Sequence, residues 1–345
     1  MSIGSVVMTP NPMRRERGMT LVEVMVSITV GLILLSGIIS IFISNKTAYR
    51  LQESTNVLNE NARYALNQMQ YHLRMGDHWG GVERDNITID ATLGALGITT
   101  TCTESNAISA TGFVGIEGGA TSPLDCIADD DYEPNTDILI VRYGEPERVL
   151  SVDVVAETDI FIRTAVGRRG MIFQGSSLAS LPADLYDAGD PDPPPIANYR
   201  YMTVIYYIRQ CASQDLGTPD VCDAEDDSTP TLARLVLSGT ALVQEDVVAG
   251  VEQMQISYAL LDESVDPPNL EYKDATTIQA NNEWAEVANI QVSMVIRAEE
   301  FDVAFTDNRT FAMYGGYAYT PVAADRNFRR KLFNFSVQIR NQTRA

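Results

Sequence analysis

The chain has 345 residues, of which 45% are hydrophobic, and a formal net charge of −21. So acidic a chain repels nucleic acid and anionic lipid headgroups, which excludes both as expected ligands of its soluble part. The first 18 residues run against this balance, because Arg14, Arg15 and Arg17 outweigh the single Glu16.

An apolar segment follows this basic start. Residues 24–45 are 22 residues without a charge. At 1.5 Å per residue such a helix reaches about 33 Å, enough to cross a hydrocarbon core of about 30 Å. The basic patch before it keeps the N-terminal end in the cytoplasm. The run is too long for an ordinary cleaved secretory signal, and a plain single-pass anchor is the simplest alternative.

The helix is predicted to continue beyond the membrane. Residues 46–75 contain no proline and no glycine, and Gly76 suits a helix C-cap. Apolar residues recur there at three- and four-residue spacing, at Leu58, Ala62, Ala65, Leu66, Met69 and Leu73. We therefore expect one helix over about 19–75, with a transmembrane half (19–45) and an amphipathic half (46–76) that packs on a globular domain.

Residues 77–345 are predicted to form that globular domain, mainly of β-strands. Residues 77–136 are rich in turn-forming residues and predict loops. Later runs rich in β-branched and aromatic residues predict strands at 137–143, 159–165, 199–209, 232–237, 251–260, 287–296 and 333–339. The fold class is therefore α+β, with a long helix against a mainly antiparallel sheet.

The four cysteines indicate disulfides rather than a metal site. No CxxC pair occurs and the chain has only two histidines, His72 and His78, which disfavours zinc. In an exported chain an even number of cysteines predicts two bridges. Three pairings are possible, and proximity along the chain favours Cys102 with Cys126 and Cys211 with Cys222.

Three acidic clusters could bind calcium, because carboxylate oxygens are its preferred ligands. They are Asp129, Asp130, Asp131 and Glu133; Asp184, Asp187, Asp190 and Asp192; and Asp223, Glu225, Asp226 and Asp227. None fits the EF-hand spacing, so a solvated acidic surface without a cofactor is the expectation. The two histidines come without a nucleophile motif, and we expect no enzyme.

The junction at residues 18–23, Gly18-Met19-Thr20-Leu21-Val22-Glu23, carries the most specific signal. With basic residues before it and the apolar run after it, it resembles the signal of type IV prepilins and type II secretion pseudopilins. The resemblance implies that a prepilin peptidase cuts after Gly18 and methylates the new N-terminus at Met19. A carboxylate in a transmembrane helix is costly, so Glu23 needs a partner, unless it only marks the headgroup level.

Further segments resemble the PilW family of minor pilins. They are the helical segments around 31–53 and 58–75, and the patches at 206–210, 232–239, 247–260, 288–298 and 329–341. The resemblance implies a single-pass protein of the bacterial inner membrane with a periplasmic C-terminal domain, later carried into the extracellular pilus. Its partners would be other minor pilins, the major pilin and the inner-membrane assembly machinery, and its role would be to prime pilus assembly at or near the tip. Two alternatives are a GspJ-like pseudopilin and a pilin-anchored adhesin that uses residues 77–200.

Overall fold

The computed structural model describes residues 18–90, 93, 114–119, 126–154, 158–182, 185, 189–212, 222–223, 226–262, 265–266 and 268–341. The chain divides into two compact units, one that ends at Glu53 and one that begins at Ser54. The leader before Gly18, Cys102, Asp184, Asp187 and Glu225 lie outside the described residues.

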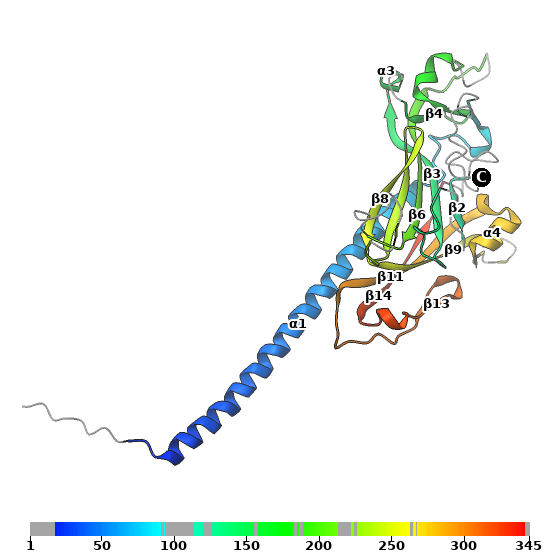
Figure 1. The fold of residues 1–345 in the computed structure, drawn as a ribbon. Coiled ribbons are helices and arrows are strands. Elements are labelled where there is room, and N and C mark those ends of the chain that lie inside the picture. The colour runs from blue at the N-terminus through cyan, green and yellow to red at the C-terminus, as the bar shows by residue number, and fades with distance from the viewer. Residues whose placement is uncertain are drawn as a thin grey trace, which may run out of the picture. The chain divides into compact units, whose positions relative to one another are not determined.

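Helix α1 (Leu21–Met75) confirms the predicted long helix (Figure 1). Its first part is long and apolar enough to cross a membrane, and it is the one helix of that kind in the described chain. Some hydroxyl groups in this part bond to carbonyls within the helix: Ser27 Oγ donates to the carbonyl of Glu23 at 2.7 Å, and Thr29 Oγ1 donates to that of Val26 at 3.1 Å. Polar side chains satisfied in this way do not oppose burial in lipid.

In the second unit, α1 buries one face against the β-structure. Its buried apolar residues are Leu58, Ala62, Ala65, Met69 and Leu73, five of the six predicted from their spacing, and the sixth, Leu66, is partly buried. Two alanines in the middle of this face let the helix backbone come close to the strands. The predicted packing of this helix face on the β-structure is therefore confirmed.

The larger sheet has eight strands in the order β1-β5-β4-β6-β3-β2, with β7 paired to β6 and β8 paired to β7. Only the β1–β5 pair is parallel. The strands are β1 (Ile87–Ile89), β2 (Ile116–Gly119), β3 (Ile138–Val149), β4 (Ile160–Ala165), β5 (Gly170–Gln174), β6 (Ile196–Arg209), β7 (Thr231–Ser238) and β8 (Ala241–Ala249). The long β6 pairs with β4 through its first half and with β7 through its second.

The smaller sheet has four antiparallel strands in the order β10-β9-β11-β14. They are β9 (Val251–Asp262), β10 (Asn269–Lys273), β11 (Val287–Phe301) and β14 (Phe328–Gln338). A two-stranded ladder of β12 (Phe311–Ala312) and β13 (Ala318–Tyr319) lies in the connection between β11 and β14. Two short helices, α3 (Ser151–Val154) and α4 (Ala275–Asn281), complete the regular structure together with 3-10 turns.

The main core gathers α1, the inner face of the smaller sheet and one face of the larger sheet. Asp137 joins the two sheets, because its N–H donates to the carbonyl of Met254 at 2.9 Å and its carboxylate accepts from the N–H of Ile256 at 2.7 Å. Gly118 of β2 leaves room for the buried Tyr258, whose hydroxyl would lie 2.0 Å from a Cβ there.

All seven predicted strands are present, but the single expected sheet is two. The division falls at Gly250, between β8 and β9, where φ is +86° and a Cβ would lie 2.7 Å from the carbonyl oxygen of Arg297. Only glycine suits this conformation, and here the chain leaves the larger sheet and enters the smaller one. The sequence pattern predicts separate strands here and gives no signal for this corner.

Candidate functional site

The predicted processing junction lies at the start of α1. Met19 is 78% exposed, and no atom comes within 4 Å of where a side chain on Gly18 would begin. Thr20 caps the helix, since its Oγ1 accepts the N–H of Glu23 at 3.3 Å. Thr20 and Glu23 therefore stand in the spacing of a capping box, and the peptide bond between Gly18 and Met19 precedes the first helical turn.

Glu23 begins an uncovered apolar helix. The structure shows no ion pair to its carboxylate among the described residues. The large apolar side chains from Leu21 to Ile43 are all exposed, between 40% for Val24 and 76% for Leu21. One carboxylate thus stands at the start of a surface that water does not solvate well, and this surface needs either lipid or other helices around it.

The Cys211–Cys222 disulfide is confirmed, and it links the end of β6 to the segment before β7. Cys126 is also disulfide-bonded. Because Cys102 lies outside the described residues, its pairing with Cys126 stays a prediction.

A buried polar network, which the sequence pattern does not predict, lies against the disulfide. The guanidinium of Arg209 is 1% exposed and donates to Asp131 and to Asp246, both at 2.7 Å. It also lies 3.5 Å and 3.6 Å from the sulfurs of Cys211 and Cys222. The only sequence signal was an arginine that directly follows a run of apolar and aromatic strand residues, which indicates a buried cation.

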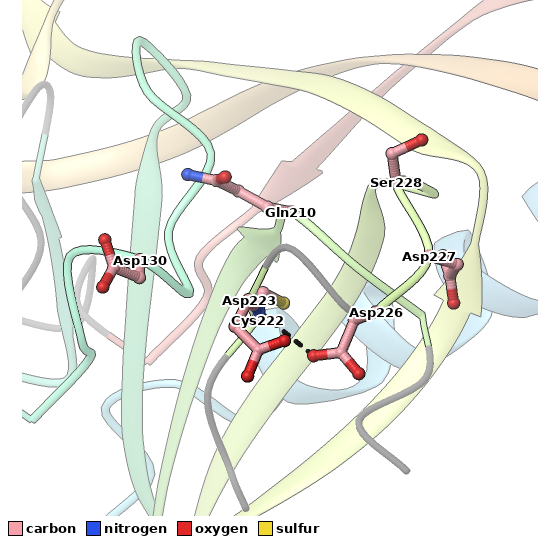
Figure 2. Close-up of a pocket in the computed structure, with 7 residues that line it drawn as sticks. All are labelled: Asp130, Gln210, Cys222, Asp223, Asp226, Asp227 and Ser228. Carbon is pink, nitrogen blue, oxygen red and sulfur yellow. Dashed lines mark hydrogen bonds between the residues drawn. The ribbon is translucent and has the colours of Figure 1, made fainter. Parts of the chain in front are cut away.

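Two of the three acidic clusters meet beside this network, at a pocket of about 490 Å³ (Figure 2). Its lining residues are Asp130, Gln210, Cys222, Asp223, Asp226, Asp227 and Ser228. Two of these carboxylates accept hydrogen bonds from nearby backbone N–H groups. Asp226 accepts from the N–H of Asp223 at 3.1 Å, and Asp227 accepts from that of Thr229 at 2.7 Å.

Two further aspartates of the acidic clusters form ion pairs with arginines. Asp131 pairs with Arg209 beneath the pocket, and Asp190, from the second cluster, pairs with Arg168 at 2.8 Å. The pocket offers hard oxygen atoms that suit a cation such as calcium, but the bonds to the backbone also account for them. The expectation of a solvated acidic surface without a bound cofactor therefore stays a prediction.

Both histidines make contacts that stabilise the fold. His72 of α1 is buried and packs against the rings of Tyr143 and Tyr206, and burial, with the nearby Arg234 charge, lowers its pKa to about 4. The Nδ1–H of His78 donates to the carbonyl of Gly144 at 2.8 Å. His72 therefore lies where α1 packs on the larger sheet.

Comparison with known proteins finds similarity in two segments of the chain. Residues 205–341 match the family described as Type IV Pilus-assembly protein W, and residues 13–39 match the prokaryotic N-terminal methylation motif. A search of curated proteins finds no match. Among solved structures, a type IV-like pilin from Thermus thermophilus is similar at 10% identity over 74% of this chain and 98% of that chain, with a TM-score of 0.26, too low to bear on the fold. The chain therefore combines a prokaryotic methylation motif at its start with a region at its end that is similar to the type IV pilus-assembly protein W family.

Proposed function

We propose that the chain is a minor pilin that primes assembly of a type IV pilus and is incorporated at or near the fibre tip. The observation that carries this is the methylation motif together with the helix that it enters, whose large apolar side chains are uncovered from Leu21 to Ile43. Such a helix lies in the inner membrane before assembly and among the helices of other subunits afterwards. The protein has a structural role and not an enzymatic one.

The proposed location follows from the same features. The basic residues before Gly18 stay in the cytoplasm, so the domain that follows α1 reaches the periplasm. The Cys211–Cys222 disulfide suits that oxidising compartment. A pseudopilin of a type II secretion system shares these features, but the match of residues 205–341 to a pilus-assembly family favours the pilus.

Glu23 supplies the proposed contact between subunits. Peptidase cleavage after Gly18 would create a methylated amine at Met19, at nearly the same depth as Glu23 in the membrane. In a bundle of helices an unpaired carboxylate is costly, so the amine of a neighbouring subunit is its natural partner. Sliding by one helical turn, about 5.4 Å, would separate the charges, and the pair therefore sets the axial register.

The proposal is tested by Glu23→Leu in the full-length chain, produced in cells that make pili. The intact mass of the extracted protein should show a mature chain of 345 − 18 = 327 residues that begins at a methylated Met19, in wild type and variant alike. Co-purification with other pilins and the number of pili should fall in the variant. Glu53→Leu, an exposed glutamate of α1 outside the apolar run, is the matched control and should change neither.

Two results would contradict the proposal. A mature chain that still begins at Met1 would refute processing at Gly18. Normal pilus numbers and normal co-purification with correctly processed Glu23→Leu protein would refute the pairing role.

A further inference from the structure

The outer face of the smaller sheet carries a continuous set of uncharged side chains, all of them polar except that of Ala259. The strand register places them in three cross-strand rows: Gln255–Ser293–Asn334, Ser257–Gln291–Ser336 and Ala259–Asn289–Gln338, with Tyr272 of β10 extending the last row. We call these ten residues the polar face. The alternate residues of the same strands, such as Ile256, Val292 and Phe335, point into the main core.

The polar face has no charged residue, although the chain carries a net charge of −21. Exposed strand positions elsewhere do carry charges, for example Glu147 and Arg148 of β3 and Glu245 and Asp246 of β8. Charges on a sheet surface keep it soluble and keep other chains away. Their absence from all three rows favours contact with an uncharged partner, because a charge buried by that contact would have to be paired.

The chain itself already covers one end of this face with peptide segments. Gln255 donates through Nε2 to the carbonyl of Asn135 at 2.9 Å, and the N–H of Tyr314 donates to Ser293 Oγ at 3.0 Å. Gln255 and Ser293 are buried as a result. The side chains of the polar face thus bind the main chain of loops that cross it.

Ser257 and Ala259 of β9 are buried as well. The side of the polar face formed by β14 and the start of β11, which we call its open end, has the same chemistry and is not covered in the described structure. Asn334, Ser336 and Gln338 are exposed, and Asn289 and Gln291 are half-buried. The carboxamide oxygen of Asn289 accepts from Ser336 Oγ at 2.6 Å and from Tyr272 Oη at 3.3 Å, which fixes the amide and leaves its N–H groups to donate outward. Beside this end, Leu261 and Leu270 face each other across β9 and β10 and are 46% and 39% exposed.

We propose that the open end of the polar face binds an extended, uncharged peptide segment of a partner subunit. The segment crosses β11 and β14 as the chain's own loops do. The side chains of Asn289, Gln291 and Ser336 bond to its main chain, and apolar side chains of the segment contact Leu261 and Leu270. This inference rests on the proposed function, because it assumes that the protein assembles with other subunits. A neutral glycan could also meet amide groups and a tyrosine, but the peptides already seated on the face favour a peptide.

Photo-crosslinking in the full-length chain tests this contact. A benzophenone amino acid is placed at Gln291 or at Ser336, and at Glu147 as the control, in cells that assemble pili. Sequencing of the crosslinked peptides should return one uncharged segment of one partner subunit from both face positions and not from the control. Crosslinks only to a second copy of this chain, or no crosslink above the control, would overturn the inference.

Charged variants give an independent measurement. Gln291→Lys and Ser336→Arg should lower co-purification with the crosslinked partner at least about tenfold, which corresponds to about 1.4 kcal/mol. Glu147→Lys should leave it unchanged, and all three should melt at the wild-type temperature. If Glu23→Leu lowers co-purification but both face variants do not, the assembly role stands and the polar-face inference falls. Binding of a soluble N-acetylglucosamine oligomer that Gln291→Lys abolishes would overturn the peptide assignment.

Discussion

Loss of Arg209 should cost much more stability than loss of an arginine in a partly exposed ion pair. Its charge is paired with Asp131 in a site where both side chains are at most 2% exposed. Removal of one partner leaves a buried carboxylate without its cation, which costs about 3–5 kcal/mol. Arg209→Met should lower the free energy of unfolding in urea by that amount. Arg234→Met, which removes a partly exposed pair with Glu245, should cost about 1 kcal/mol or less. Equal losses for the two variants would contradict this ranking.

Two buried carboxyls and one half-buried carboxyl make stability depend on pH in an unusual direction. Burial raises the pKa of Asp137 to about 7, and burial is also the main reason that the pKa values of Asp77 and Glu133 rise to about 6. In the unfolded chain such groups titrate near 4. Between pH 4 and pH 7 the folded state therefore holds more protons, and by linkage the free energy of unfolding should increase as the pH falls from 7.5 to 5.

His72 acts in the opposite direction. With its pKa lowered to about 4, it stays neutral in the folded state while the unfolded chain binds a proton below about pH 6.5. Urea unfolding curves across this range should show the three carboxyls outweighing the one histidine. Asp137→Asn should flatten the dependence between pH 6 and 7.5. A free energy of unfolding that falls steadily from pH 7.5 to 5 would contradict the carboxyl assignment.

At the scale of elements, the Cys211–Cys222 bridge holds the connection between β6 and β7. The bridge spans 11 positions of sequence, and closure of a loop near this length is worth about 3 kcal/mol in the chain-entropy model. The double variant Cys211→Ser, Cys222→Ser should lose about that much stability in urea. Thiol labelling of the denatured, unreduced wild type should give no signal at these two cysteines. Labelling of both would show that the bridge does not form.

The elements differ in how far the sequence predicts them. Helix α1 was predictable because the buried residues of its face, from Leu58 to Leu73, recur at three- and four-residue spacing along the sequence. Strands β9 and β11 were predictable from their composition. The polar face was not, because it depends on β9 pairing with β11 and β11 with β14, and the register of strands so far apart in sequence is set by packing.

Distance along the sequence also decides which site residues could be predicted. Gly18, Met19 and Glu23 form a local motif that one stretch of sequence contains. Arg209 and Asp131 are 78 positions apart, and only the fold brings them together. Short strands such as β10 and β5 were missed, since five residues give too little alternation to separate a strand from a loop.

At the scale of the whole molecule, net charge should dominate the response to salt. The mature chain would carry −21 − 2 = −23, and repulsion among these charges opposes compact structure. Sodium chloride at 150 mM screens charges beyond about 8 Å, so the melting temperature of the detergent-extracted protein should rise by a few degrees over that at 10 mM. Calcium chloride at matched ionic strength should raise the melting temperature by no more than sodium chloride does. An additional rise with calcium that Asp226→Asn abolishes would instead establish a cation site at the pocket of Figure 2.

The last described strand runs alongside α1 in the same direction. Lys331 Nζ donates to Asn59 Oδ1 at 2.8 Å near one end, and Asn341 Nδ2 donates to the carbonyls of Arg74 and Gly76, at 3.3 Å and 3.0 Å, at the other. Tension applied along the helix would therefore pull β14 lengthwise past β11. The ladder from Asn289–Gln338 to Arg297–Arg330 would then be loaded in shear, with its hydrogen bonds sharing the force, and not opened one bond at a time. That is the mechanically resistant way to anchor a domain on a helix that is pulled.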